Sequence, residues 1–109
     1  MTVQDLLKFP ELTPLHLEEG EREVDGVYIG DLLSWVMGRA QSGNVWITIM
    51  SNLNVLAVAS LADVSCLVLA EGVTLEEDVL NAAKEKGINV LSSSLPAFET
   101  AKLLFGETL

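Results

Sequence analysis

The chain has 109 residues, half of them apolar, and its 16 acidic and 6 basic residues give a formal net charge of −10. This length fits one domain and leaves no room for a second core of any size. So acidic a surface repels nucleic acid and anionic lipid, and we expect neither as a partner. No apolar run reaches the about 18 residues that a membrane-spanning helix needs. The N-terminus lacks a signal-peptide pattern, so we expect a cytoplasmic location.

The first part of the chain predicts short elements. Residues 2–8 predict a helix capped by Thr2, with Pro10 after its end. Residues 14–30 contain two extended pieces around Gly20, the second at 24–29, that lead into a sheet. Residues 30–40 predict a helix in which Asp31 takes the N-cap position. Its apolar residues recur at helical spacing and are expected to form the buried stripe: Leu32, Leu33, Val36, Met37 and Ala40.

The rest of the chain alternates strands with helices. The apolar run within residues 53–61 has no clear period, so a buried helix and a buried strand remain open; the cap-type residues before it and its alanines favour a short helix. The predicted order is strand 45–50, helix 53–61, strand 64–70, helix 75–86, strand 88–91 and helix 96–105. This order predicts an α/β fold, a single domain of alternating βα units around a mostly parallel sheet flanked by helices. The domain is expected to span 1–109, with a core at about 24–105 and an N-terminal extension at 1–23.

Several local patterns predict where the last two helices begin and end. Thr74 and Glu77 fit a capping box, and Gly87 fits a C-terminal stop. In the last helix Phe98, Ala101, Leu104 and Phe105 are expected to face inward, with Ser94 or the backbone near Leu95 as its cap. The lone Cys66, flanked by apolar residues, is expected to be a small buried hydrophobe.

A candidate ligand site lies beyond the carboxyl ends of the predicted strands, where open parallel sheets bind ligands. The residues that follow these strands are Asp31, Ser51, Asn52, Asn54, Glu71, Gly72, Ser92, Ser93 and Ser94. Two interpretations stay open, since such residues cap helices in every α/β domain and can also hold a small ligand. The charges of Asp31 and Glu71 disfavour a phosphate.

Catalytic machinery is nearly absent from the sequence. His16 is the only histidine, and no G-x-S-x-G elbow, phosphate-binding loop or dinucleotide fingerprint occurs. One histidine and one cysteine cannot form a usual zinc site. We therefore expect no enzyme, no cofactor and no metal, and a serine nucleophile among residues 92–94 is the least favoured hypothesis.

Three segments carry a resemblance to a known family. They are "VYIGDLLSWVM", "VWITIMSNLNVLAVASLADVSCLVLAEG" and "GINVLSSSLPAFETA". From about Val24 to Leu104 the chain resembles the DRTGG domain family, which includes the N-terminal domain of HPr kinase/phosphorylase and domains joined to CBS domains or phosphate acetyltransferase. The resemblance implies a small α/β regulatory or dimerising module of bacterial signalling or redox systems. Some short members carry the label "serine kinase", which this chain does not support because it lacks a kinase domain.

The chain departs from the signature of that family. The Asp-Arg-Thr part falls around Ser51 to Asn54, which reads "SNLN", and the Gly-Gly part falls at Glu71–Gly72. Without the arginine, the obvious partner for an anion is lost.

These observations lead to two main functional hypotheses. The first is a non-enzymatic regulatory or interaction module that forms a homodimer, because so apolar a small chain is expected to hide surplus apolar surface at an interface. The second is a sensor of a nucleotide or metabolite at the carboxyl edge. The acids crowded between Glu18 and Asp25 leave two interpretations open: they keep the protein in solution, or they form a surface that attracts a basic protein partner.

Overall fold

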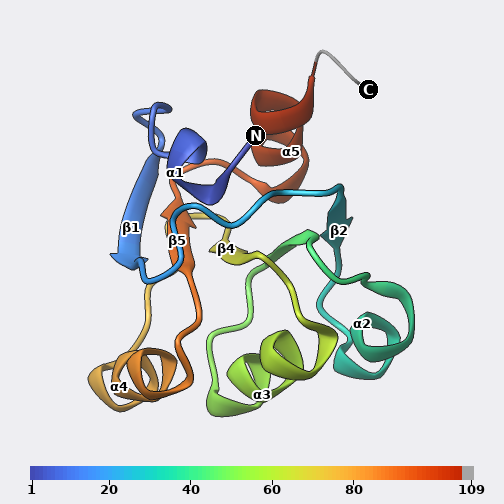
Figure 1. Cartoon of the computed structure of the whole chain (residues 1–109), viewed down its shortest axis with the longest axis vertical. Coiled ribbons are helices and arrows are strands. Elements are labelled where there is room, and N and C mark those ends of the chain that lie inside the picture. Colours follow the sequence, from blue (N-terminus) through green and yellow to red (C-terminus); the bar gives the residue numbers. More distant parts are fainter. Residues whose placement is uncertain (107–109) are drawn as a thin grey trace.

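A five-stranded sheet in the order β1-β5-β4-β3-β2 forms the centre of the computed structural model, which describes residues 1–106 (Figure 1). The strands are β1 (Leu12–His16), β2 (Val27–Ile29), β3 (Val45–Thr48), β4 (Cys66–Leu69) and β5 (Val90–Ser93). β2 to β5 run parallel, and β1 joins β5 antiparallel as an edge strand. The predicted α/β class and mostly parallel sheet are therefore confirmed. The last three residues of the predicted domain, 107–109, lie outside the described residues.

Helices cover both faces of the sheet. The helices are α1 (Val3–Leu6), α2 (Leu33–Arg39), α3 (Leu53–Ala62), α4 (Glu77–Lys86) and α5 (Ala97–Phe105). α2, α3 and α4 pack on one face through one apolar cluster, and α1 and α5 pack on the other face through a second (Figure 1). No helix among residues 1–106 is long and apolar enough to cross a membrane.

The central strands are buried on both sides, as their continuous apolar sequences require. On β4, Leu67 and Leu69 face α2 to α4, whereas Cys66 and Val68 face α1 and α5. A strand alternates its side chains between the two faces, so a run without polar residues fits only a doubly covered sheet. The segment at 53–61, which was open between helix and strand, is helical, and Asn52 caps it by accepting a hydrogen bond from the Val55 amide.

Three end signals were interpreted wrongly. α4 begins at Glu77 with Glu76 as N-cap and no side-chain cap bond, so the Thr74–Glu77 capping box does not form. The N-cap of α2 is Leu32 rather than Asp31. The N-cap of α5 is Pro96 rather than Ser94 or Leu95. In each case the polar residue that was predicted as the cap lies one or two residues before the observed N-cap. The Gly87 stop is confirmed, with φ +68°.

Two helices expose residues that were expected to be buried. Phe98 on α5 is 63% exposed, while Ala101 and Leu104 are buried as predicted. On α2, Leu32 is 56% and Met37 46% exposed, and Val36 is fully buried. Helical spacing defines a stripe, but the width of the buried part depends on how closely neighbouring elements approach.

Candidate functional site

The carboxyl edge of the parallel strands gathers the predicted site residues, but their polar groups are largely occupied within the protein. The serines show this most clearly, because β5 extends to Ser93 instead of ending at Leu91. Ser92 Oγ donates to the Val73 carbonyl at 2.7 Å. Ser93 Oγ shares a 2.7 Å hydrogen bond with Thr100 Oγ1 and accepts from the Leu95 amide at 3.1 Å. Ser94 is the exposed member of the three.

The backbone amides beside the serines are also occupied. The Gly72 amide donates to the Ser93 carbonyl at 2.7 Å, and the Glu71 amide donates to the Leu95 carbonyl at 2.8 Å. The Ser94 amide donates to the Glu11 carbonyl at 3.0 Å. A phosphate cradle needs free N–H groups that converge on one point. Here the amides after β4 bind the turn after β5 instead, and the Ser94 amide binds Glu11.

Six of the predicted residues line two open hollows, whereas Asp31, Glu71 and Ser93 line neither. One, of about 590 Å³, is lined by Ser51, Asn52, Leu53, Asn54, Glu76, Asp78 and Val79. The other, of about 310 Å³, is lined by Pro10, Glu11, Thr13, Leu15, Gly72, Thr74, Ser92 and Ser94. The predicted residues therefore share an edge but not a single pocket, and acidic side chains line both hollows.

Asp31 connects the ends of β2 and β3. Its Oδ1 accepts from the Thr48 hydroxyl at 2.6 Å and from the Ile49 amide at 3.1 Å. The Asp31 carboxylate thus supplies an acceptor for the Ile49 amide, which has no partner in the parallel sheet where β3 ends. We therefore assign Asp31 a structural hydrogen-bonding role rather than the predicted helix cap.

The turn at Glu71–Gly72 has a left-handed backbone at both residues, with φ +62° and +72°. Glycine adopts this conformation without steric cost, whereas a residue with a Cβ adopts it at a cost of about 1–2 kcal/mol. Glu71 thus occupies a position that is shaped for glycine.

The chain also matches the model of a known protein family. The model of the DRTGG domain matches residues 15–106, most of the chain. The chain belongs to the DRTGG domain family. Glu71, with its left-handed backbone, stands where the first glycine of the signature is expected.

One solved structure shares the fold. It is described as the CBS and DRTGG domains of the regulatory region of Clostridium perfringens pyrophosphatase complexed with an activator, diadenosine tetraphosphate. The TM-score is 0.70 at 17% identity, and the match covers 94% of this chain and 44% of the other. The present chain thus spans less than half of that regulatory region. A comparison with curated protein sequences gave no match.

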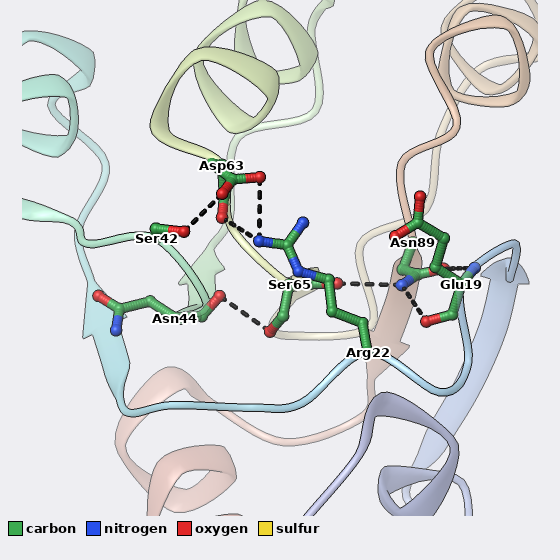
Figure 2. Close-up of polar contacts among 7 residues, drawn as sticks. All are labelled: Glu19, Arg22, Ser42, Asn44, Asp63, Ser65 and Asn89. Atoms are coloured by element: carbon green, nitrogen blue, oxygen red, sulfur yellow. Dashed lines mark hydrogen bonds and ion pairs between the residues drawn. The ribbon is translucent and has the colours of Figure 1, made fainter.

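The opposite, amino edge of the sheet contains a polar network that the sequence did not reveal (Figure 2). Arg22 forms an ion pair with Asp63 at 2.9 Å and also donates to its carbonyl at 2.7 Å. Ser42 donates to the same carboxylate. The Ser42 hydrogen bond, and then Arg22, hold the pKa of Asp63 below its ordinary value.

Asn89 binds the backbone of the acidic segment, Glu18 to Asp25, at this edge of the sheet (Figure 2). Its Oδ1 accepts from the amides of Glu18 and Glu19 at 2.8 and 2.9 Å, and its Nδ2 donates to the carbonyls of Glu19 and Ser65 at 3.0 Å each. Ser65 in turn donates to the Asn44 carbonyl. These polar groups satisfy one another, so we interpret the network as a structural latch. In the sequence, the polar Asn89 beside the apolar residues of a predicted strand is the one signal that could have indicated it.

The histidine and the cysteine lie away from the serines. His16 pairs in register with Val90 at one end of β5, whereas Ser93 pairs with Leu12 at the other end. Cys66 is fully buried as predicted, and burial raises the pKa of its thiol. No group of three or more metal-ligating side chains occurs among residues 1–106.

Proposed function

We propose that this DRTGG domain is a non-catalytic regulatory module that acts by self-association within a bacterial signalling or redox system. The observation that carries the proposal is the engagement of the Ser92 and Ser93 hydroxyls in internal hydrogen bonds. A hydroxyl that already bonds to the fold, with the one histidine at the other end of the strand, has no base to activate it. The likeness to a regulatory region supports the same interpretation.

Two measurements test this proposal. Light scattering over a range of concentrations should give a mass that rises from 11.8 kDa toward twice that value. A fluorophosphonate probe should leave the native protein unlabelled, with Ser93→Ala as control. A monomer at every concentration would remove the self-association, and labelling that Ser93→Ala abolishes would establish a serine enzyme instead.

A ligand-sensing role at the carboxyl edge is the second candidate. The 590 Å³ hollow with Ser51, Asn52 and Asn54 at its rim favours it, because these side chains offer neutral hydrogen-bonding groups. Glu76 and Asp78 in the same lining oppose a polyphosphate such as the activator of the pyrophosphatase region. A thermal-shift series should therefore show stabilisation by nucleosides or neutral metabolites and none by diadenosine tetraphosphate. Flat melting curves throughout would exclude this candidate.

The acidic segment remains a candidate surface for a basic protein partner. Glu21, Glu23 and Asp25 are exposed, while the backbone of the segment is fixed by Asn89. Binding of such a partner should weaken steeply as salt rises. Salt-insensitive binding would remove the electrostatic explanation.

A further inference from the structure

The outer side of α2 presents large apolar side chains to water. Trp35 is 52% exposed and Leu32 is 56% exposed. The Arg39 guanidinium lies over the Trp35 ring at 3.8 Å from its centroid, so the cation covers one side of the indole. The neighbouring helix α3 adds Leu53 and Leu61, which are 51% and 72% exposed.

This apolar surface coincides with a gap in the acidic charge. No aspartate or glutamate occurs between Asp31 and Asp63, although the chain has 16 acidic residues. α2 and α3 both lie within this acid-free segment and pack side by side on one face of the sheet (Figure 1). Since α2 and α3 contribute no acidic residue, a contact centred on α2 brings fewer like charges together than contacts through other surfaces.

Residues of opposite charge flank α2 at equal distances in sequence from Trp35. Asp31 and Arg39 lie four residues on either side of Trp35, and Leu32 and Gly38 lie three residues on either side. Asp31 precedes the N-cap Leu32 and Arg39 is the last residue of α2, so the two charges lie at opposite ends of the helix. In a two-fold symmetric dimer, every contact between two residues occurs twice, with the two copies exchanged. A two-fold axis at Trp35 therefore places Asp31 of each copy opposite Arg39 of the other.

The geometry points to a homodimer in which two α2 helices pack antiparallel across a two-fold axis at Trp35; this rests on the self-association proposed above. In this arrangement Arg39 of each copy meets Asp31 of the other, and Leu32 meets Gly38. The Asp31 Oδ1 already binds Thr48 and Ile49, and its Oδ2 makes no hydrogen bond or ion pair within residues 1–106. The second oxygen is therefore open to a guanidinium.

Gly38 supplies an independent argument. It lies inside α2, where glycine costs about 1 kcal/mol relative to alanine. A Cβ at this position would meet nothing within 4 Å, so packing within the protein does not require glycine. Close approach of a second helix does require a small residue, and the open space beside Gly38 fits the exposed Leu32 side chain of a second copy.

A charge exchange tests the pairing. Arg39→Glu places a carboxylate against Asp31 twice in the homodimer, and Asp31→Arg places two cations against Arg39. Each variant alone should weaken dimerisation about a hundredfold in analytical ultracentrifugation. An equimolar mixture of the two should recover the dimer, because both contacts become attractive. Circular dichroism verifies that each variant is folded. Failure of the mixture to dimerise while each variant is folded would overturn the inference.

A steric variant tests the interface without touching Asp31. Gly38→Leu should raise the melting temperature of the dilute monomer, since leucine is a better helix former, and should abolish the dimer. The matched control is Phe98→Glu, which adds a charge at an exposed aromatic residue on the other side of the sheet and should leave the dimer intact. A wild-type monomer would refute the self-association itself. A dimer that survives Gly38→Leu and Arg39→Glu but not Phe98→Glu would place the interface on α5 and overturn this inference alone.

Discussion

Ser93 on β5 and Thr100 on α5 share a buried hydrogen bond between their hydroxyls, 2.7 Å apart. Both residues have no exposed surface. The pair joins the last strand to the last helix, and Ser93 Oγ also receives the Leu95 amide between them. The hydroxyl that seemed a candidate nucleophile by sequence therefore fixes a strand-to-helix turn.

This contact predicts a stability effect. Ser93→Ala should lower the free energy of unfolding by about 1–3 kcal/mol, because the Leu95 amide loses its acceptor and the Thr100 hydroxyl keeps only the Leu95 and Pro96 carbonyls. Ser94→Ala, at the exposed neighbour, should change it by less than about 0.5 kcal/mol. Urea denaturation measures both, and equal effects of the two substitutions would contradict the assignment.

Helix capping gives a second prediction. Asn52→Ala should destabilise the protein by about 0.5–2 kcal/mol, because Asn52 accepts the Val55 amide at the start of α3. Thr74→Ala should have little effect, because α4 begins at Glu77 without a side-chain cap. Thermal unfolding of the two variants distinguishes the caps, and a larger loss for Thr74→Ala would restore the capping box.

The left-handed turn gives a third prediction. Glu71→Gly should stabilise the protein by about 0.5 kcal/mol, since the relief of the left-handed conformation exceeds the added freedom of the unfolded chain. Gly72→Ala should destabilise it by about 1 kcal/mol or more, because the same strain is introduced at φ +72°. If Glu71→Gly lowers the melting temperature, the Glu71 side chain contributes a contact that offsets its strain.

The amino-edge latch predicts a dependence on pH. The pKa of Asp63 is lower in the folded protein than its ordinary value of 3.8. The ionised form is thus favoured by folding, and this stabilisation is present above pH 3.8 and disappears as the pH falls through the lowered folded pKa. The stability difference between the wild type and Asp63→Asn, measured by urea denaturation, should therefore shrink in acid. A difference that is constant down to the most acid pH would show that the ion pair does not contribute.

The reactivity of Cys66 gives the last prediction. Burial excludes reagents and raises the thiol pKa, so the thiolate is disfavoured. A thiol reagent such as iodoacetamide should label Cys66 in urea and leave it unlabelled in buffer. Rapid labelling under native conditions would show that β4 opens readily.

Taken alone, the sequence determined the alternation of strands and helices and the residues at the carboxyl edge. Continuous apolar runs such as "SCLVLA" require burial on both faces, and few folds provide it. It also indicated a cap-type residue at the start of α3, which the structure identifies as Asn52, and it determined the stop at Gly87, because these signals are local. The burial of Phe98 and Leu32 was predicted wrongly, because helical spacing identifies the apolar side of a helix but not which elements pack against it.

Only the tertiary structure decided what the polar residues do. Ser93 bonds to Thr100, Asp31 to Thr48, and Asn89 to the backbone of the acidic segment. The Asp31 and Asn89 contacts join residues 17 and 71 positions apart, and chain folding alone brings them together. A serine, an aspartate or an asparagine has the same hydrogen-bonding groups whether it binds a ligand or its own fold, so its role depends on which groups the fold places beside it.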